Sequence, residues 1–225
     1  MATHLLTGAG SGIGAALAAA LHSRGDSLVL LARSRERADE LASRWNGAQT
    51  LVADLAVAGA LEDLALPESL DSVVHAAGAV DLGAVAELTS QQWREQIEVN
   101  LFAPAELTRR ALPALRAARG TVVFVNSGAG LRANPQWAAY AASKHGLRAL
   151  ADALRSEEQQ HGVRVTSVYP GRTATPMQER VRDQEGKEYD ASDWIRPETV
   201  ADAIVGVLDL PHDATIPDVT VSPVP

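Results

Sequence analysis

The sequence predicts a single α/β domain, a doubly wound parallel β-sheet with helices on both of its faces. Short apolar runs that end in turn residues alternate with longer amphipathic segments through most of the 225 residues. This alternation is typical of repeated β-α-β units, in which neighbouring strands are parallel. No linker-like stretch interrupts the pattern, and single α/β domains reach this length. We therefore expect residues 1–225 to form one domain.

The apolar runs give the expected strands in order along the chain. Strands are placed at 3–7, 27–32, 49–53, 72–77, 121–126 and 163–169. The amphipathic segments between them predict helices at 12–24, 35–45, 58–65, 91–117 and 137–160. A further helix at 197–208 starts with Pro197, which favours the first helical turn, and a final strand follows at 218–222. The charged and polar segment 172–196 breaks the pattern, and we predict that it forms a mobile lid over the site.

Composition argues against several classes of protein. Hydrophobic residues make up 46% of the chain and charged residues 21%, which is ordinary for a globular domain. The formal net charge of −8 offers no general attraction to nucleic acid or to an anionic membrane. The chain has no cysteine, its six histidines show no metal-ligand spacing, and its amino terminus has no apolar leader pattern. We expect no metal, nucleic-acid or membrane partner, and a cytoplasmic location.

The first expected strand runs into a glycine-rich loop, TGAGSGIG at 7–14, and then into an alanine-rich helix. The loop has the spacing G-x-x-x-G-x-G, with Gly8, Gly12 and Gly14. Glycines let the chain turn tightly, let backbone amides approach a pyrophosphate at a helix N-terminus, and let strand and helix pack closely. In this strand-loop-helix context the loop predicts dinucleotide binding, and a purely structural turn is the alternative.

The residues after the second expected strand bear on which dinucleotide binds. An NAD enzyme would place an acid there to hold the ribose 2′-hydroxyl, whereas this chain reads LARSR at 31–35. Arg33 and Arg35 are suited to pair with a 2′-phosphate through charge-assisted hydrogen bonds. We therefore predict NADP(H) as the cofactor in preference to NAD(H). The alternative is that both arginines only decorate the exposed start of a helix.

Residues 140–144 read YAASK, which places Tyr140 and Lys144 four residues apart. On a helix these positions share one face, so the ammonium would lie close to the phenol. The chain has 18 arginines but only two lysines, so chance is a poor explanation for the pair. A nearby positive charge favours phenolate, and we expect Lys144 to lower the pKa of Tyr140. The pair predicts a tyrosine that exchanges a proton with a substrate.

With its glycine loop, its Tyr-x-x-x-Lys pair and its strand pattern, the chain resembles the short-chain dehydrogenase/reductase family over nearly its whole length. The resemblance implies a Rossmann-type fold and a catalytic tetrad of Asn100, Ser127, Tyr140 and Lys144. Tyr140 would exchange a proton with a carbonyl or alcohol oxygen while hydride moves to or from the nicotinamide, and Ser127 would orient that oxygen. Lys144 would hold the nicotinamide ribose, and Asn100 would anchor a water that links Lys144 to solvent.

The resemblance also implies cofactor contacts outside the tetrad. Asp54 would accept a hydrogen bond from the adenine amino group, or else would cap the next helix. The segment YPGRTAT at 169–175 is similar to the family loop that meets the nicotinamide carboxamide, which assigns Thr175 and, more weakly, Thr173. Further contacts are implied for Ser11, Ile13, Ser34, Leu55, Ala77, Gly78 and Pro170.

The sequence departs from the family pattern at HAAG, residues 75–78, where Ala76 stands at the place of an asparagine. This departure leaves open how the loop is hydrogen-bonded, but it does not affect the proton chemistry. His75 has no partner acid nearby in the sequence, so we interpret it as a strand-end residue and not as a catalyst.

The expected activity is hydride transfer between NADP(H) and a small carbonyl or alcohol substrate. Two alternatives are a dinucleotide-binding regulator or scaffold without turnover, and a sugar-nucleotide epimerase or dehydratase, for whose larger substrate domain 225 residues leave little room. Residues that would line the pocket, or else pack in the core, are Trp137, Met177, Tyr189 and Trp194. The resemblance also suggests a homodimer or homotetramer built on the helices at 91–117 and 137–160.

Overall fold

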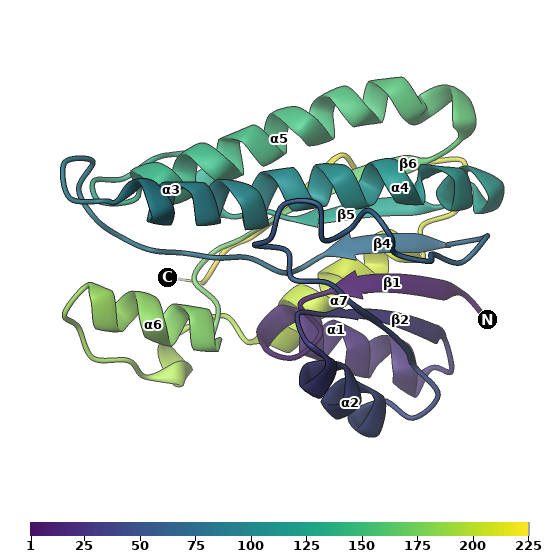
Figure 1. Cartoon of the computed structure of the whole chain (residues 1–225), viewed down its shortest axis with the longest axis horizontal. Helices are drawn as coiled ribbons and strands as arrows, with labels where there is room; N and C mark the ends of the chain where they lie inside the picture. Colours follow the sequence, from purple (N-terminus) through teal and green to yellow (C-terminus); the bar gives the residue numbers. More distant parts are fainter. Residues whose placement is uncertain (225) are drawn as a thin grey trace.

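The computed structural model describes residues 1–224 and confirms the predicted α/β fold class (Figure 1). A seven-stranded parallel sheet has the strand order β3-β2-β1-β4-β5-β6-β7. The strands are β1 (Thr3–Thr7), β2 (Ser27–Ala32), β3 (Gln49–Val52), β4 (Ser72–His75), β5 (Thr121–Val125), β6 (Arg164–Pro170) and β7 (Asp218–Val221). The chain builds outward from β1 to β3 and then returns to the other side of β1. The strand order therefore reverses between β1 and β4, where open α/β sheets bind their ligands.

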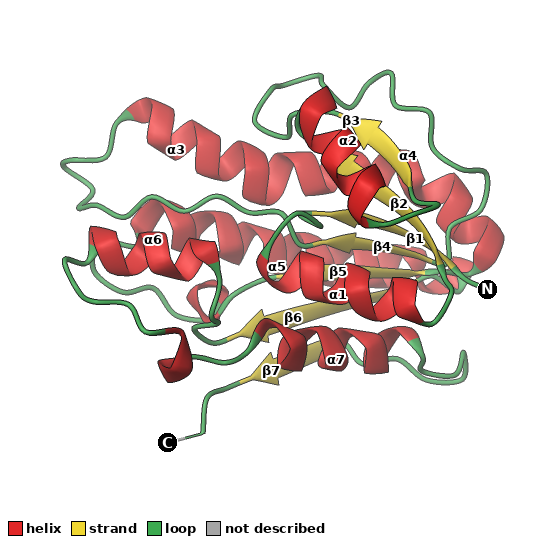
Figure 2. Cartoon of the chain, turned by 90° about the horizontal axis from the view of Figure 1, so that it is seen from below, coloured by secondary structure: helices red, strands yellow, loops and turns green. Residues whose placement is uncertain are grey.

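Helices cover both faces of the sheet. They are α1 (Gly12–Ser23), α2 (Arg35–Arg44), α3 (Ser90–Ile97), α4 (Ala103–Ala118), α5 (Ala138–Glu158), α6 (Pro176–Gln184) and α7 (Pro197–Leu208). Figure 2 looks onto the face that carries α1, α2 and α7, with α3, α4 and α5 behind the sheet. Within residues 1–224, no helix combines the length and apolar character that a bilayer crossing requires.

The sheet is buried on both faces because its central strands are apolar at successive positions. Leu5 of β1 packs in the cluster under α4 and α5, whereas the next residue, Leu6, packs in the cluster under α1 and α7. Neighbouring residues of a strand point to opposite faces, so a continuous apolar run supplies both cores. Strands β4 and β5 are buried along their whole length. This core holds the strand ends that carry the candidate site.

The predicted helix at 58–65 is wrong. Residues 57–64 form successive turns, in which the Ala60 N–H donates to the Val57 carbonyl (3.2 Å) and the Leu64 N–H donates to the Leu61 carbonyl (3.3 Å). Gly59 has φ +80°, in the left-handed region, which interrupts a right-handed helix. Leu61 is nevertheless buried against the core, so the apolar pattern reports burial of this segment without reporting its backbone shape.

The predicted helix at 91–117 is interrupted. Between α3 and α4, residues Glu98–Phe102 form a π-helical turn with Asn100 at its centre. Pro104, in the first turn of α4, has no N–H to donate to the carbonyl four residues earlier, which is that of Asn100. The missing α-helical bond accounts for the break, and π turns of this kind are frequent at functional sites.

Candidate active site

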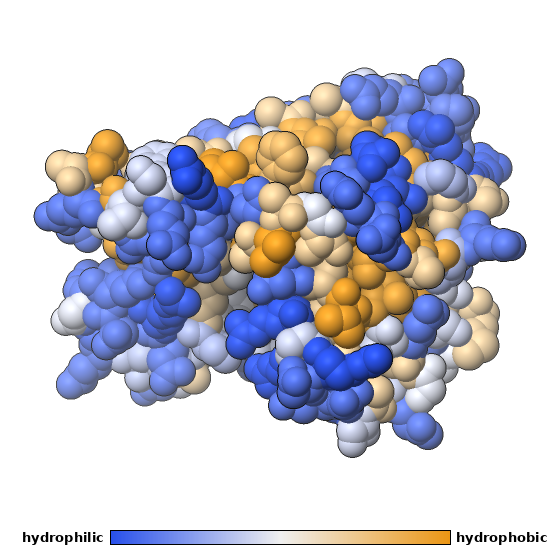
Figure 3. All heavy atoms as spheres, in the orientation of Figure 1, coloured by the Kyte–Doolittle hydropathy of each residue, from blue (hydrophilic) through white to orange (hydrophobic). Residues whose placement is uncertain are grey.

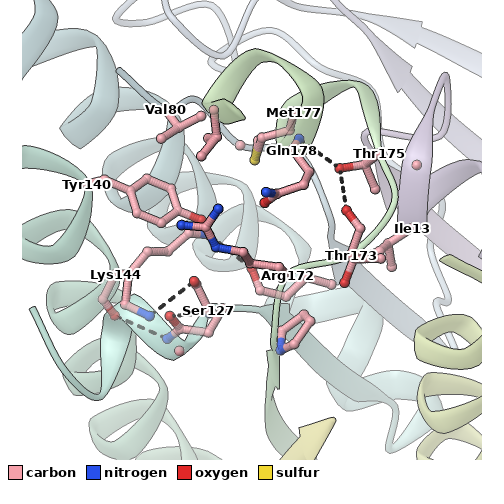
Figure 4. A pocket seen from close by; sticks show the side chains of 18 of the residues that line it. Ile13, Val80, Ser127, Tyr140, Lys144, Arg172, Thr173, Thr175, Met177 and Gln178 are labelled. Atoms are coloured by element: carbon pink, nitrogen blue, oxygen red, sulfur yellow. Dashed lines mark hydrogen bonds between the residues drawn. The ribbon is translucent and has the colours of Figure 1, made fainter. Parts of the chain in front are cut away.

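A cavity of about 460 Å³ lies at the carboxyl ends of β1, β4, β5 and β6, below α6. Its walls come from the loops that follow these strands, together with the start of α5 (Figure 4). Figure 4 shows one side of the cavity formed by Tyr140, Ser127 and Lys144 and the other by Ile13, Thr173 and Thr175. Of the sequence-predicted site residues, it is lined by Gly8, Ser11, Gly12, Ile13, Ala77, Gly78, Ser127, Tyr140, Lys144, Pro170, Thr173 and Thr175.

A second cavity of about 660 Å³ adjoins the first and opens beside β2 and β3. The residues that line both cavities are Ser11, Ala77, Gly78, Val80, Pro176 and Met177. The predicted residues that line only the second are Arg33, Asp54 and Leu55. Gly14, Ser34 and Asn100 line neither cavity. The two cavities together offer an extended site across the point where the strand order reverses.

The predicted glycine loop folds tightly between β1 and α1. Gly8 and Gly12 have φ of +74° and +53°, a region that favours glycine. A Cβ on Gly8 would lie 2.7 Å from the backbone of Ala76 and Ala77, and one on Gly14 would lie 2.3 Å from the Gly8 carbonyl oxygen. Gly14 therefore allows α1 to pack against the loop, although it does not line a cavity itself. The loop leaves a cradle at the N-terminus of α1 that a side chain would fill.

Thr7, which sequence reasoning missed, fastens the loop after β4. Its Oγ1 accepts hydrogen bonds from the backbone N–H groups of Ala76 and Ala77, both at 3.1 Å. The register that pairs Thr7 with His75 brings these groups together. A side chain of β1 thus holds the loop in which Ala76 replaces the family's asparagine.

Tyr140 and Lys144 lie on one face of α5 as predicted, and both are buried. The Lys144 Nζ lies 5.8 Å from the centre of the Tyr140 ring and donates to the Val125 carbonyl (3.0 Å). Burial lowers the pKa of Lys144 to about 8. Burial also raises the pKa of Tyr140, while hydrogen bonding with Ser127 acts in the opposite direction. The predicted lowering of the pKa of Tyr140 by Lys144 is therefore wrong, because removal of the phenol from water dominates.

Asn126, a second residue missed in the sequence, ties β5 to α5. Its Nδ2 donates to the Lys144 carbonyl (3.1 Å), and its Oδ1 accepts from the Ser127 N–H (2.9 Å). The side chain is buried. The Asn126 side chain lies between Ser127 and α5, the helix that carries Tyr140 and Lys144. It therefore sets the distance between Ser127 and that helix. Only the adjacency of Asn126 to Ser127 could have signalled this role.

Replacing Asn126 with alanine is expected to lower kcat/KM for a carbonyl substrate about 10- to 100-fold and the free energy of unfolding by about 1–3 kcal/mol. The substitution leaves the part-buried Ser127 N–H and the buried Lys144 carbonyl without this partner. Steady-state kinetics and urea unfolding measure the two effects. Asn134→Ala, at a cavity-lining residue, is the control. Equal losses in both variants would contradict the positioning role.

Asn100 connects the loop after β4 to the Tyr-x-x-x-Lys segment. Its Oδ1 accepts from the Ala79 N–H (2.8 Å), while its Nδ2 donates to the Ala79 carbonyl (2.8 Å) and to the Ser143 Oγ (3.0 Å). Ser143 in turn donates to the Tyr140 carbonyl (2.7 Å). The Asn100 side chain thus links the loop after β4 to the backbone of α5 at Tyr140, through Ser143. Its role in holding a water stays a prediction.

His75 lies next to the site without facing it. Its Nε2 is hydrogen-bonded to Thr108 Oγ1 (2.8 Å), and its ring stacks on Phe124 with centroids 5.0 Å apart. Burial, with a smaller contribution from the Lys144 charge, lowers the pKa of His75 to about 3. The residue is therefore neutral at physiological pH, in agreement with its interpretation as a strand-end residue.

The arginines after β2 do not all face the second cavity. Arg33 lines it, as do Arg37 and Arg44, but Arg35 does not. Ser34 caps α2 by accepting a hydrogen bond from the Arg37 N–H (3.3 Å). The helical repeat then brings Arg37, rather than Arg35, to the cavity wall.

Asp54 also lines the second cavity. Its Oδ1 accepts from the Ala56 N–H (3.0 Å). This bond closes a turn, and no helix follows, so the alternative of a helix cap is wrong.

The predicted lid at 172–196 is folded over the first cavity. It contains α6 and a short 3₁₀ turn at Ala191–Asp193. Asp81 accepts hydrogen bonds from Arg180 (2.7 Å) and Gln184 (3.1 Å), which tie α6 to the loop after β4. Of the aromatic and methionine residues predicted for the pocket, Trp137 and Met177 line the first cavity, whereas Tyr189 and Trp194 do not.

Comparisons with known proteins agree with this architecture. The family model described as short chain dehydrogenase matches residues 2–186. An uncharacterized oxidoreductase of Staphylococcus epidermidis is 31% identical over 98% of this chain and 96% of its own. A bovine protein described as dehydrogenase/reductase SDR family member 7B is 35% identical over 84% of this chain and 63% of its own.

Solved structures extend the likeness. An alcohol dehydrogenase from the archaeon Thermococcus sibiricus, complexed with 5-hydroxy-NADP, superposes with a TM-score of 0.82 at 27% identity, covering 98% of this chain and 96% of its own. A short-chain dehydrogenase from Streptomyces avermitilis superposes with a TM-score of 0.80 at 28% identity, covering 98% and 87%. The glycine loop, the strand order and these matches agree, and the chain belongs to the short chain dehydrogenase family of oxidoreductases.

Proposed function

We propose that this oxidoreductase uses NADP(H) to interconvert a small carbonyl compound and its alcohol, with Tyr140 as general acid and base. The observation that carries the proposal is that Tyr140, Ser127 and Lys144 line one cavity together with the glycine loop. The runner-up from the sequence, a dinucleotide-binding regulator without turnover, has no separate observation in its favour.

The chain's residues fit a nicotinamide dinucleotide. The cradle at Gly8 and Gly12 is too tight for side chains and presents backbone amides at the start of α1, which suits a pyrophosphate. Gly8 and Gly12 line the first cavity, Gly10 lines the second, and Ser11 lines both. Asp54 and Leu55 would flank the adenine, and Pro170, Thr173 and Thr175 the nicotinamide. When bound, the cofactor would supply or accept the hydride.

Tyr140 is suited to donate a proton in the reductive direction. Burial raises its pKa, so the phenol holds its proton at neutral pH. The proton would pass to the carbonyl oxygen of the substrate, which the Ser127 hydroxyl would orient. Lys144, buried and close to the Tyr140 ring, would stabilise the phenolate that remains. In the oxidative direction the same groups would remove the proton from an alcohol.

Arg33 and Arg37 support the preference for NADP(H). Both line the second cavity, where the ribose of the adenosine would lie, and Arg37 is paired with Glu40. Arg33→Ala is expected to weaken NADPH binding about 10- to 100-fold while NADH binding changes less than about threefold, because a charge-assisted bond to the 2′-phosphate is lost. Fluorescence titration with each reduced cofactor measures this.

Arg35→Ala is the matched control, because Arg35 lies two residues away but does not line the cavity. It should leave both dissociation constants unchanged. An equal effect of the two substitutions would refute a specific role for Arg33 and leave only a general charge effect.

The function is tested with the purified protein, NADPH and a panel of ketones and aldehydes, with alcohols and NADP⁺ in the reverse direction. Turnover of any member supports the oxidoreductase. Tight NADPH binding without turnover across the panel would favour the regulator.

Assembly into a homodimer or homotetramer and a cytoplasmic location stay predictions. The face that carries α3 and α4 shows apolar patches among charged groups (Figure 3). Phe102, at the junction of these helices, is 64% exposed, which supports assembly through this region.

A further inference from the structure

Arg172 brings a positive charge to the wall of the active-site cavity. It follows β6 after Gly171, and its side chain is 35% exposed. Figure 4 shows its guanidinium reaching toward the space beside Tyr140. The nearby wall is largely apolar and includes Val80, Met177 and Val181. A cation in such a wall is a means of orienting a ligand.

The guanidinium of Arg172 is held in place by three neighbours. Its Cζ lies 5.9 Å from the centre of the Trp137 ring and 5.5 Å from that of Trp194. Glu185 accepts hydrogen bonds from both of its Nη atoms, at 2.9 Å from Nη1. These contacts restrict the side chain before any ligand binds, so little conformational entropy is lost on binding.

The charges around Arg172 do not cancel. Glu185 also pairs with Arg182, at 3.3 Å, so one carboxylate faces two guanidiniums. Asp81, an acid in the loop after β4, is paired with Arg180 at 2.7 Å. A guanidinium has five N–H donors, and Glu185 uses two of those on Arg172. Among the described residues no other acceptor bonds to Arg172, so an edge of the guanidinium remains for a ligand.

Gln178 of α6 lines the same cavity and supplies an independent observation. The residue is 7% exposed, and its Nε2 is buried without a hydrogen-bond partner within residues 1–224. Figure 4 shows its amide directed toward the same space as Arg172. A buried amide without a partner is costly unless a ligand satisfies it, and rotation about its last bond exchanges donor and acceptor.

We propose that Arg172 and Gln178 bind a carboxylate of the substrate, so that the enzyme acts on oxo acids and the corresponding hydroxy acids. This inference rests on the proposed function, since it concerns the substrate of the same cavity. A carboxylate matches the single net positive charge of the Arg172, Arg182 and Glu185 cluster, whereas a phosphate ester would bring about two negative charges. Two converging donors, a guanidinium edge and an amide, match its two oxygens.

The test compares acids with their neutral counterparts on one carbon skeleton. The probes are 2-oxobutanoate, 3-oxobutanoate and 4-oxopentanoate, each with its methyl ester, and NADPH as reductant. The wild type should prefer at least one acid over its ester. Arg172→Gln should lower kcat/KM for that acid about 10- to 100-fold while the ester changes less than about threefold. Gln178→Leu should lower the acid's value about 3- to 10-fold without changing NADPH binding.

Two further variants test whether Arg172 binds the substrate or only stabilises the local structure. Glu185→Gln should keep or raise the acid preference, because it removes the acid that competes for Arg172. Arg182→Gln, which shares the partner Glu185 but does not line the cavity, removes one charge of the cluster and should therefore lower the acid preference less than Arg172→Gln does. An equal loss of kcat/KM for the acid and its ester in Arg172→Gln would overturn the proposal, as would loss of the acid preference in Glu185→Gln. Weakened NADPH binding in Gln178→Leu would show that Gln178 is not part of the carboxylate site.

Failure of this inference and failure of the proposed function give different results. Turnover of esters without any acid preference would reject the carboxylate site and leave the oxidoreductase intact. If no probe turns over, tryptophan fluorescence of the NADP⁺-loaded protein is titrated with 4-oxopentanoate, because Trp137 and Trp194 flank Arg172. Binding that Arg172→Gln abolishes would support the carboxylate site, and no binding would overturn it.

Discussion

Tyr140→Phe is expected to lower kcat about 10²- to 10⁴-fold, the range that a positioned acid or base contributes to a reaction. The variant keeps the ring, so its edge-to-face packing with Trp137, at 5.7 Å between centroids, is preserved. Only the hydroxyl that would exchange the proton is removed. The measurement is kcat for whichever carbonyl substrate the wild type reduces with NADPH.

The controls for Tyr140→Phe are the dissociation constant for NADPH and the thermal unfolding temperature, and both should stay close to those of the wild type. Tyr140 is 6% exposed, and its hydroxyl is hydrogen-bonded with Ser127. Unchanged turnover would refute the proton-transfer role. Loss of turnover together with loss of the fold would show that the hydroxyl is structural.

Lys144→Met is expected to make the cofactor-free protein more stable by about 1–3 kcal/mol at pH 7 while lowering kcat at least about 10²-fold. Burial lowers the pKa of Lys144 from 10.5 to about 8, so the folded state holds its charge at a cost of about 3 kcal/mol. Loss of the bond from Nζ to the Val125 carbonyl offsets part of the gain. Activity falls because the charge beside Tyr140 is removed.

The difference in stability between Lys144→Met and the wild type should depend on pH in one direction. Between pH 8 and 10.5 the unfolded chain holds the Lys144 proton and the folded chain does not, so the contribution of Lys144 to the stability of the wild type rises with pH across that range. The advantage of Lys144→Met should therefore be largest below pH 8 and should fade toward pH 10.5. Urea unfolding at several pH values measures it.

Lys187→Met is the matched control, because Lys187 is the chain's other lysine and is exposed. Its replacement should change neither stability nor activity by a measurable amount. A Lys144→Met protein that is less stable than the wild type at pH 7 would show that the ammonium contributes more through its contacts than burial takes away.

Local sequence signals predicted most of the fold because their causes are local. The apolar runs gave β1 and β2 at their observed boundaries, since a strand buried on both faces must be apolar throughout. Pro197 marked the start of α7, because proline suits the first turn of a helix. The segment 58–65 failed because its apolar spacing fits turns as well as a helix and Gly59 decided between them.

Tyr140, Lys144 and the glycine loop were named from their spacing, because that spacing belongs to one helix and one turn. Ser127, Thr173 and Thr175 were implied only by the family resemblance. Contacts between distant segments could not be read in this way. Thr7 meets Ala76 only through strand pairing, and Asn126 meets Lys144 only because α5 packs beside β5. Arg172 and Gln178 become a pair only when α6 folds over the cavity.

The sequence by itself determined the α/β class, the strand and helix order and the identity of the tyrosine and lysine, since these depend on periodicity and spacing along the chain. The tertiary structure alone decided the proton affinities. Burial raises the pKa of Tyr140, against the expected lowering, and it is Lys144 whose pKa falls. The reason is physical, because the free energy of a charge depends on how much water surrounds it, and the packing of the whole chain sets that amount.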